Sequence, residues 1–551
     1  MMRLLHRAAV VALAAVSIVA LSISAQGQTA PASKNAAGLY FIAGTVLNAV
    51  TGAPVQSATV ALLSVDDNHR ITSTLSGNDG RFSLGGLAAA KYGLVVSKRG
   101  FSTAAYDEHG EFSSAIVTGD GQDTTNLVFR LVPGAVLHGV VTGDGGDPVE
   151  GASVLLFSKP QFQEPGAKIE QAETAITDDT GTYEFDNLAK GEYLLAVTAA
   201  PWYAMQHGGG KQSAMNPALD VAFPVTYFDS TTDEASATPL ALTGGSRVEA
   251  DVTLHAVPAL HLVVETPRKQ DGSGVRPQLR QTIFGIETSD SSSGFRESNQ
   301  SGTTEFTSIA PGQYELTQGD PPRVVVLDAN LSQQVESGAG IPAFGLSGTL
   351  QNASRAPYSG PAVVSLEPAD SAQGLKPMVS DFNKGSFSFN AVPTGKWQLD
   401  VQQSGLPVPV ISITAGGRVH NGNLVTVQDR AQTIIARISA DGVRVEGFAK
   451  KVEKGKAEKG APGVMVLLIP RDPVAFPNLV RRDQSDSDGS FAIRDVAPGE
   501  YTAIALENAW DLDWTRPEAV ARYLPAGIPV SVKDTRDKAV PLSGPVPVQT
   551  R

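Results

Sequence analysis

The residue types that most often carry catalysis are present in this sequence, but not at catalytic spacings. A hydrolytic zinc site needs a histidine followed at the third position by glutamate, together with a distant second histidine. None of the eight histidines meets that requirement, and His109-Gly110-Glu111 is one residue too short. The chain has no cysteine, no Gly-x-Ser-x-Gly sequence and no phosphate-binding loop ending in Gly-Lys-Ser/Thr. The glycine run from His207 to Lys211 lacks that Ser or Thr and indicates a surface loop. We therefore expect no catalytic residue, no metal and no cofactor.

One acidic stretch has a spacing close to that of a calcium-binding loop. Gln484, Asp486 and Asp488 alternate before Gly489, and Asp495 lies six residues after that glycine. An EF-hand loop also places oxygen ligands at alternate positions, but it begins with Asp and ends with a bidentate Glu. The sequence around Gly489 is also that of an ordinary hairpin turn. We prefer the turn, and calcium binding remains the alternative.

Four aromatic residues could bind a sugar ring by stacking. They are Trp202, Tyr203, Trp510 and Trp514. Trp202 lies nine residues after Tyr193, and Trp510 lies nine residues after Tyr501, so these two tryptophans occupy a repeated position. A repeated aromatic favours a structural role at the end of a sandwich, whereas a flat indole in a loop favours ligand contact. Both interpretations remain open.

A turn sequence that recurs five times must position these residues. Its glycines are Gly80, Gly181, Gly302, Gly385 and Gly489. In every copy an apolar residue follows the glycine by seven positions and an aromatic residue follows it by twelve, as in Gly80, Leu87 and Tyr92. Glycine suits a turn with positive φ, and the alternating residues after it predict a strand with one buried face. Because the glycines are 83 to 121 residues apart, the repeat is a domain and not a short solenoid unit.

A second repeated element lies upstream of the turn and completes the unit. Ile42-Ala43-Gly44 precedes Pro54-Val55, and Leu137-His138-Gly139 precedes Pro148-Val149. Short strands separated by Gly, Pro and Asp turns predict antiparallel β-sandwiches of about 100 residues. The sequence predicts an all-β tandem array of five such units after a leader. Their bounds are 39–132 (unit 1), 135–256 (unit 2), 259–338 (unit 3, divergent), 344–439 (unit 4) and 443–548 (unit 5).

The units are joined by very short junctions. Val132-Pro133-Gly134 and Val257-Pro258-Ala259 each follow a predicted strand directly. We expect a semi-rigid string of units and not flexible linkers. The mixed-charge run from Lys450 to Lys459 indicates a solvated loop within unit 5.

The Gly-centred first strand, the Pro-Val hairpin and the Asp-x-Gly-x-Phe turn together resemble the carboxypeptidase regulatory-like domain. This resemblance is best in units 1, 2 and 5, around Gly80, Gly181 and Gly489. It implies a transthyretin-like (prealbumin-like) sandwich of the carbohydrate-binding-like fold group. Because its motifs are turn and core residues, it implies a fold and no activity.

The N-terminus has the pattern of a secretory signal peptide. Arg3 and Arg7 precede an apolar run from Ala8 to Ile23, and small residues follow. We expect residues 1–25 to be the signal, with cleavage after Ala25 or Gly27; a retained anchor is the alternative. No other segment approaches membrane-spanning length, so we expect no such span in the mature chain and a periplasmic, extracellular or cell-surface location. The net charge of −13 argues against nucleic-acid partners.

These observations predict a non-enzymatic, exported binding or structural protein of the bacterial cell envelope. A glycan or an envelope protein is the expected partner. The alternatives are a carbohydrate-binding protein that uses the loop tryptophans, and an accessory subunit of a separate hydrolase or transporter. The ligand and the oligomeric state cannot be predicted from the sequence.

Overall fold

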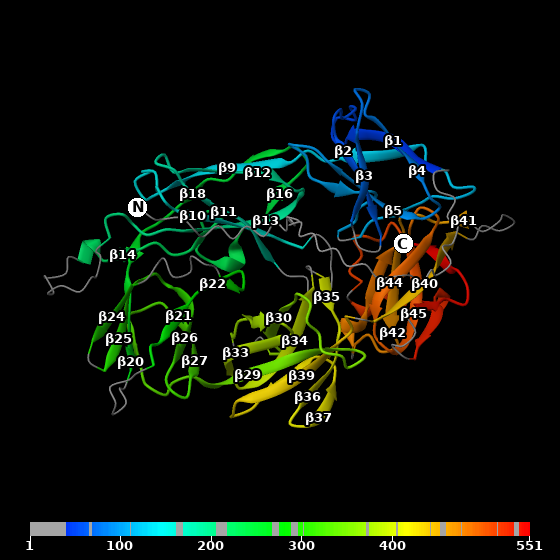
Figure 1. The fold of residues 1–551 in the computed structure, drawn as a ribbon. Helices are drawn as coiled ribbons and strands as arrows, with labels where there is room; N and C mark the ends of the chain where they lie inside the picture. Colours follow the sequence, from blue (N-terminus) through cyan, green and yellow to red (C-terminus); the bar gives the residue numbers. More distant parts are fainter. Residues whose placement is uncertain are drawn as a thin grey trace, which may run out of the picture.

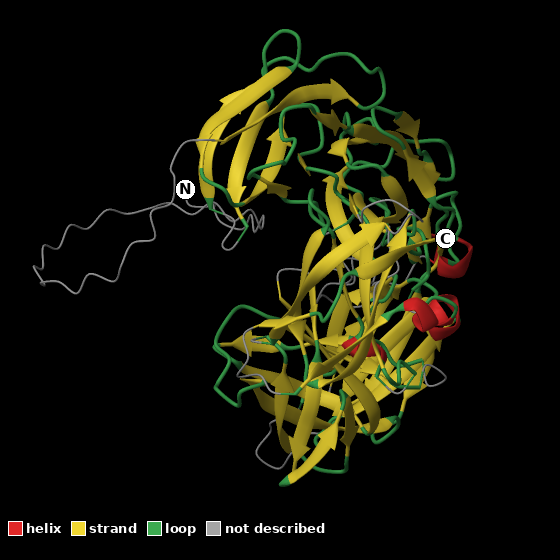
Figure 2. Cartoon of the chain, turned by 90° about the vertical axis from the view of Figure 1, so that its right-hand side faces the viewer, coloured by secondary structure: helices red, strands yellow, loops and turns green. Residues whose placement is uncertain are grey.

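The computed structural model describes residues 40–551 except positions 66–68, 111, 161–168, 205–216, 267–274, 288–295, 301, 371–373, 404–405, 441, 452–458, 475, 515 and 534–538. The predicted signal at 1–25, the glycine run at 207–211 and most of the charged loop at 450–459 lie outside these residues. The regular secondary structure of the described chain is almost wholly β-strand, which confirms the all-β fold class (Figure 2). Its one α-helix is α1 (Pro517–Ala521), and no helix in the described part is long and apolar enough to span a membrane.

Unit 1 packs two sheets around one core. The sheet orders are β4-β1-β8 and β3-β2-β5-β6, and β7 also pairs with β5. Alternate residues such as Phe82 and Leu84 on β4 point into the core between the sheets, as the sequence pattern predicts. The strands are β1 (Tyr40–Asn48), β2 (Thr59–Ser64), β3 (Arg70–Leu75), β4 (Arg81–Leu87), β5 (Lys91–Ser97), β6 (Ala104–Ala105), β7 (Ile116–Val117) and β8 (Leu127–Leu131).

Unit 2 repeats this plan, and unit 3 keeps it in part. Unit 2 has the sheet orders β12-β9-β17 and β11-β10-β13-β15. Its strands are β9 (Ala135–Thr142), β10 (Ser153–Ser158), β11 (Glu170–Ile176), β12 (Thr182–Leu188), β13 (Gly191–Thr198), β14 (Val221–Ala222), β15 (Thr226–Tyr227), β16 (Leu240–Leu242), β17 (Arg247–Glu249), β18 (Val252–Thr253) and β19 (Val257–Pro258). Unit 3 has the sheet β24-β25-β20-β28 and a second sheet through β21, β26 and β27. Its strands are β20 (Leu260–Glu265), β21 (Gln278–Arg280), β22 (Thr282–Ile283), β23 (Ile286–Glu287), β24 (Arg296–Gln300), β25 (Thr303–Ile309), β26 (Gly312–Gln318), β27 (Arg323–Ala329) and β28 (Gln333–Val335).

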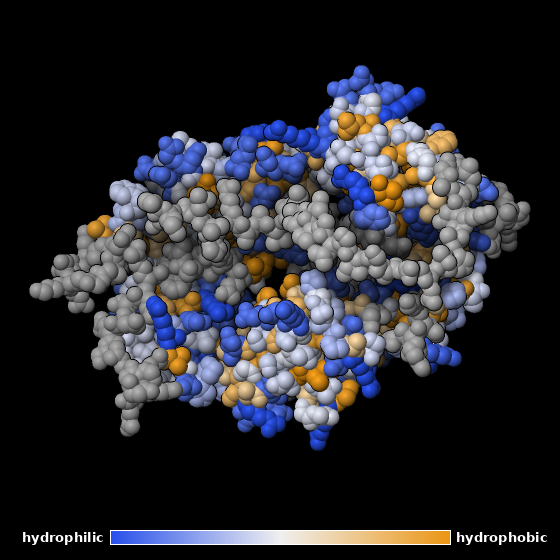
Figure 3. Space-filling model, viewed as in Figure 1, coloured by the Kyte–Doolittle hydropathy of each residue, from blue (hydrophilic) through white to orange (hydrophobic). Residues whose placement is uncertain are grey.

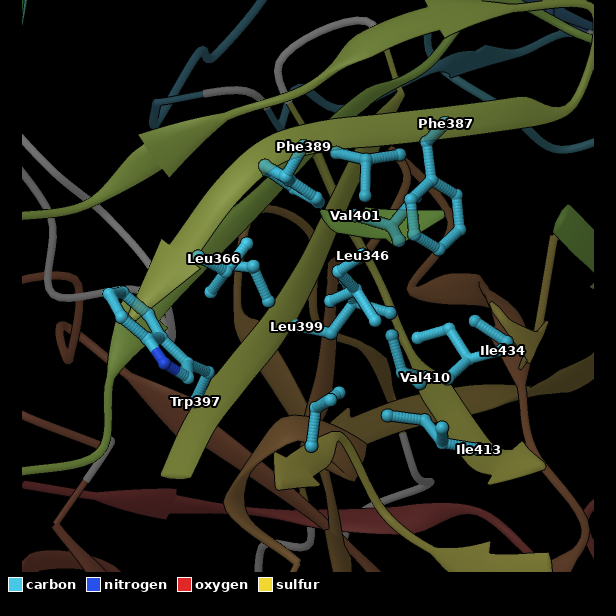
Figure 4. Close-up of a cluster of buried hydrophobic side chains, with 14 of the residues drawn as sticks. Leu346, Leu366, Phe387, Phe389, Trp397, Leu399, Val401, Val410, Ile413 and Ile434 are labelled. Atoms are coloured by element: carbon cyan, nitrogen blue, oxygen red, sulfur yellow. The ribbon is translucent and has the colours of Figure 1, made fainter. Parts of the chain in front are cut away.

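Units 3 and 4 share a continuous sheet, because the long first strand of unit 4 also pairs with β27. Arg323 lies opposite Pro342 and Val324 lies opposite Ile341. Trp397, Phe387, Phe389 and their neighbours fill the core of unit 4 (Figure 4). The strands of unit 4 are β29 (Ile341–Asn352), β30 (Val363–Pro368), β31 (Met378–Val379), β32 (Asp381–Asn383), β33 (Ser386–Pro393), β34 (Gly395–Gln403), β35 (Leu406–Val408), β36 (Val410–Ala415), β37 (Arg418–Asn421), β38 (Leu424–Val427) and β39 (Gln432–Ile438).

Unit 5 has two hydrophobic clusters. One lies between its strands, and the other lies on the outer face of β42 and β45, where the segment with Trp514, Val520 and Tyr523 covers it. The strands are β40 (Val443–Lys451), β41 (Lys459–Gly460), β42 (Met465–Pro470), β43 (Arg481–Gln484), β44 (Ser490–Val496), β45 (Gly499–Glu507), β46 (Ile528–Val532), β47 (Ala539–Pro541) and β48 (Val546–Thr550).

Most strand pairs are antiparallel, as predicted, but each unit also has a parallel pair that the sequence pattern does not predict. The first strand of every unit pairs in parallel with a late strand: β1 with β8, β9 with β17, β20 with β28, β29 with β39 and β40 with β47. A parallel partner must arrive through a long connection and not through a hairpin. The repeated hairpin motif therefore carries no information about this pairing.

The five turn glycines share one backbone conformation. Their φ angles are +74°, +73°, +78°, +83° and +85° for Gly80, Gly181, Gly302, Gly385 and Gly489. This left-handed region is accessible to glycine without a steric penalty. At Gly181 a Cβ atom would also lie 2.5 Å from the carbonyl oxygen of Val141, so the turn packs against the first strand too closely for a side chain.

The closing aromatic residue of each unit makes the same hydrogen bond. Each ring donates to the carbonyl oxygen four residues earlier, and this bond fixes the corner between the turn strand and the next strand. The pairs are Tyr92 to Ala88 (3.2 Å), Tyr193 to Ala189 (2.9 Å), Tyr314 to Ala310, Trp397 Nε1 to Pro393 and Tyr501 to Ala497 (2.8 Å each). A buried aromatic ring with one polar atom normally finds such a partner. The twelve-residue spacing in the sequence therefore has a structural cause.

The array of units closes on itself. Figure 1 shows unit 1, at the blue end of the colour scale, lying beside unit 5 at the red end. Backbone hydrogen bonds fasten the first junction to both units: Gly134 N donates to Gly100 O of unit 1 at 3.1 Å, and Gly245 N of unit 2 donates to Pro133 O at 3.0 Å. The sequence predicts a semi-rigid string of units but not that its ends meet, and here contacts between the first and last units join the two ends. On the face in Figure 3, hydrophobic residues are interspersed with polar ones.

Candidate interdomain interface

Polar and charged side chains converge where unit 1 meets unit 5. We call this contact the 1–5 interface. It is formed by β5 and residues 106–110 and 112–117 of unit 1, and by β43, the turn 485–490 and Trp510 of unit 5. The two parts are far apart in the chain, as for Ser114 and Ser485 with a separation of 371 residues.

The backbones of the two units are bonded to each other directly. Ser487 N donates to Ala115 O at 3.0 Å. Ala115 N donates to the Asp486 carboxylate at 2.9 Å, and Val117 N donates to Ser487 Oγ at 2.9 Å. Ser114 Oγ donates to Ser485 O at 2.9 Å. The turn of unit 5 therefore satisfies backbone groups of unit 1 much as a neighbouring strand would.

An ion pair lies inside this contact. Lys91 Nζ is 2.6 Å from Asp486 Oδ2, and the Asp486 side chain is mostly buried. Burial raises the pKa of Asp486, although Lys91 and the Ala115 N–H oppose the shift. Burial also raises the pKa of Asp483 to about 6, against hydrogen bonds from the Ala492 and Gln484 N–H groups. The interface therefore holds carboxyl groups whose charge is less favourable than it would be in water.

Gln484 is the centre of the hydrogen-bond network. Its Nε2 donates to Ser114 Oγ at 2.9 Å and to the backbone oxygen of Asp107. Its Oε1 lies 3.0 Å from His109 Nδ1. The Gln484 side chain is only 1% exposed, so these partners replace the water that it would otherwise bind.

Aromatic rings surround the Arg482 guanidinium. Its central carbon lies 4.5 Å from the centre of the Phe112 ring, 5.5 Å from that of Trp510 and 5.7 Å from that of Trp514. His109 stacks on Trp510 at 4.4 Å with an interplanar angle of 9°. A desolvated cation over aromatic faces is attracted by about 2 kcal/mol. The unit 1 residues Phe112 and His109 thus complete an aromatic site begun in unit 5.

The four aromatic residues proposed for sugar stacking lie in different environments. Trp514 is buried within unit 5, and one face of Trp510 is covered by His109. Trp202 is 91% exposed, and Tyr203 meets it edge-on at 5.6 Å. The structure therefore brings Trp202 together with Tyr203, and Trp510 together with Trp514, in separate units. Sugar binding remains a prediction for all four.

The acidic stretch considered for calcium has other partners in this structure. Asp486 binds Lys91 and Ala115, Asp488 accepts from Ser490 N at 2.9 Å, and Asp483 accepts from Ala492 N at 2.7 Å. No cluster of three or more His, Asp or Glu suited to a metal occurs among the residues that the structure describes. The preferred interpretation as a turn agrees with this geometry, and the turn has the added role of binding unit 1.

Sequence reasoning missed Lys91, Asp107, Phe112, Ser114 and Arg482 as members of a site. One available signal was the run Arg481-Arg482-Asp483-Gln484, which occupies a strand position in unit 5. Its alternate members Arg482 and Gln484 are both buried, although charged and amide side chains are rarely buried without partners. Four polar residues in a row next to a core strand could have indicated a covered face.

Comparison with known proteins supports the domain type. The carboxypeptidase regulatory-like domain family matches residues 41–132 and 136–209. The resemblance inferred from the sequence is therefore confirmed for these two segments, which make up less than half of the chain. No curated protein shows significant sequence similarity to the chain.

Several solved structures share a general likeness with the chain. A streptococcal ancillary pilin is 12% identical, with 54% of this chain and 98% of the pilin covered and a TM-score of 0.20. The Bacillus anthracis TIE protein is 10% identical, with 70% and 68% covered and a TM-score of 0.16. A minor pilin of Streptococcus agalactiae is 14% identical, with 40% and 97% covered and a TM-score of 0.21. At such scores the likeness carries no argument about function.

Proposed function

We propose that this chain, which carries carboxypeptidase regulatory-like domains in its first two units, is a non-catalytic structural and binding protein of the bacterial cell envelope. The observation that carries the proposal is the 1–5 interface. There, charged side chains that could otherwise act chemically contact the other unit: Lys91 pairs with Asp486, and Arg482 lies over the ring of Phe112. Residues used in this way stabilise an arrangement of domains.

A closed array gives each unit a fixed position relative to the others. Loops at the ends of sandwiches are then held at defined distances, so that several weak contacts to an extended partner could act together. Closure by an ion pair, hydrogen bonds and aromatic contacts also suits a chain without cysteine, which has no disulfide to restrain its domains. An accessory role beside a separate hydrolase or transporter would use the same scaffold.

The test combines localisation, shape and activity. The full chain is expressed in a bacterial host, and its mature N-terminus and cell fraction are determined. We expect processing near Ala25 or Gly27, recovery from the periplasm or the envelope, and no turnover of peptide or glycan substrates. Small-angle scattering of the purified protein should fit the closed array. Cytosolic retention of the unprocessed chain, or substrate turnover that an interface substitution abolishes, would contradict the proposal.

A second candidate, carbohydrate binding, is favoured by the exposure of Trp202. Indole side chains are among the largest apolar groups, and one that is 91% exposed presents nearly its whole surface to solvent. Its edge-to-face contact with Tyr203 limits how the ring can turn. Polysaccharide pull-down with the wild type, W202A and V379A tests this candidate, since Val379 is also strongly exposed but is aliphatic. Loss of binding in W202A alone supports it, and equal binding by all three proteins removes Trp202 from consideration.

A further inference from the structure

A histidine at the junction of units 2 and 3 has a carboxylate at each ring nitrogen. His261 lies on β20, Glu305 lies on β25, and Asp220 lies immediately before β14 in unit 2. His261 Nε2 is 2.9 Å from Asp220 Oδ2, and Nδ1 is 3.1 Å from Glu305 Oε1. The three side chains are 14–25% exposed, so water has limited access to them.

The number of N–H groups on the His261 ring decides how many of the two carboxylates it can bind. A neutral imidazole carries one N–H and can donate to only one of the two carboxylates. The imidazolium carries two N–H groups and can donate to both at once, in charge-assisted hydrogen bonds. Complete bonding at this junction therefore requires the protonated ring.

The same residues take part in joining the two units. β14 of unit 2 pairs with β19, the strand that leads into unit 3, with Ala222 opposite Val257. The carbonyl of Asp220 accepts a hydrogen bond from Ala259 N at 2.9 Å. The Asp220–His261 contact lies beside this pairing, while the Glu305–His261 contact lies within unit 3. Asp220 therefore contacts His261 through its side chain and the connecting backbone through its carbonyl oxygen.

We propose that His261 is a pH-sensitive contact between units 2 and 3. It stabilises the junction of the two units when it is protonated and weakens that junction when it is neutral. The proposal is independent of what the array binds and of where it acts. It assigns a conformational role to a residue that takes no part in the 1–5 interface.

The expected direction of the pH effect follows from the groups around the ring. Among the described residues, Asp220, from the segment before β14, and Glu305, from β25, are charged groups that face His261. Burial alone would lower the pKa of His261, but its bonds to Asp220 and Glu305 outweigh burial and raise it above the ordinary value of 6.5. A raised histidine pKa contributes stability that is fully present below pH 6.5 and is lost as pH rises through the raised value.

The first measurement is an NMR titration of the histidine ring signals in the full chain, with the His261 signal assigned by its absence in H261Q. We expect His261 to titrate above pH 6.5 in the wild type. D220N and E305Q each remove one negative charge, so each should lower its titration midpoint. Even if H261Q does not fold, these two variants keep the titration interpretable, because the signal that shifts in both identifies His261.

The second measurement is hydrogen exchange of peptides that cover 217–223 and 256–262, corrected for the intrinsic effect of pH. The wild type should exchange faster at pH 8.5 than at pH 6, and H261Q should exchange equally at both. The midpoint of thermal unfolding of units 2 and 3 should fall by about 2–4 °C between pH 6 and pH 8.5 in the wild type and not in H261Q. H420Q is the control, since His420 is an exposed residue on β37. Titration at or below pH 6.5, or the same pH dependence of exchange in H261Q and the wild type, would overturn the proposal.

Discussion

The recurring turn has two versions in this molecule, and they differ in what surrounds the same position. Three residues before the turn glycine, unit 2 has Asp178 and unit 5 has Asp486. Asp178 is exposed, and hydrogen bonds from Thr180 and Thr182 lower its pKa. Asp486 is mostly buried against unit 1, and its pKa is raised. One turn is complete within its own unit, and the other is completed by a second unit.

The strand before the turn differs in the same way. Five residues before the glycine, units 1 and 2 have Leu75 and Ile176, which are 62% and 59% exposed, whereas unit 5 has Gln484 at 1%. Seven residues before it, Ser73 and Thr174 are exposed, but Arg482 is buried. The usual rule is therefore inverted at these positions: the apolar residues are exposed, and the polar ones are buried. An apolar residue at this strand edge tolerates water, while a polar residue is buried because unit 1 supplies its partners.

A third position is the same in both versions. Four residues before the glycine, the hydroxyls of Ser76, Thr177 and Ser485 each accept from a backbone N–H and donate to a backbone carbonyl within their own unit. Docking has therefore changed the outward-facing side chains and left the internal turn intact. The turn is a structural constant to which unit 5 adds an interface.

Reversal of the charge of Asp486 should have the largest effect on the docked turn of unit 5. Asp486→Lys places two ammonium groups where the 2.6 Å pair with Lys91 now lies. Loss of the mostly buried Asp486 carboxylate, with a like charge in its place opposite the partly exposed Lys91, should weaken the 1–5 interface by about 3 kcal/mol. Small-angle scattering should show an opened, longer particle, whereas Asp178→Lys in the exposed turn should leave the shape unchanged.

The double variant K91D/D486K is the matched control. It restores opposite charges across the contact and should recover most of the closed shape. If the single variant D486K stays closed, or if the double variant is as open as D486K, the ion pair does not help to hold the units together.

Truncation of Arg482 should have the next largest effect. Arg482→Ala removes the cation that Phe112, Trp510 and Trp514 surround, which should cost about 2 kcal/mol of interface stability. Because two of the four tryptophans adjoin the guanidinium, urea unfolding followed by tryptophan fluorescence reports the loss. Thr174→Ala, at the same repeat position in unit 2, should change stability by less than about 0.5 kcal/mol. Equal effects of the two substitutions would mean that unit 1 contributes little to the burial of Arg482.

The difference between the two turns also marks what the sequence could predict. Spacing identifies Gly181 and Gly489, and the aromatic residues that follow them, because these residues act within one hairpin and its corner. The 1–5 interface depends on partners such as Asp107 and Gln484, which are 377 residues apart. No periodicity links them, and the segment that contains His109 and Ser114 has no repeated pattern. Local rules therefore predict each unit, and contacts between units require the tertiary structure.

The smallest expected effect is on the pH dependence of stability, because acid should destabilise unit 2 through Asp178 and stabilise unit 5 through Asp483. Asp178 has a lowered pKa, so it stabilises unit 2 above its ordinary pKa of 3.8, and this contribution is lost as pH falls towards the lowered value. Asp483, beside the turn of unit 5, has a pKa raised to about 6, so its charge is unfavourable at neutral pH. That penalty is relieved as pH falls from about 6 towards 3.8.

Asp483→Asn and Asp178→Asn separate these two effects in urea unfolding between pH 7 and pH 3. The amide that replaces the Asp483 carboxyl group stays neutral, so the stability of unit 5 should depend less on pH between about 7 and 4 than in the wild type. Asp178→Asn should flatten the response only below about pH 4, where the wild-type carboxylate becomes protonated. Two results would contradict this account: loss of stability of wild-type unit 5 between pH 7 and pH 5, or the same dependence of stability on pH in D483N and the wild type. Either would show that burial of the Asp483 carboxyl group carries no free-energy penalty in the closed array.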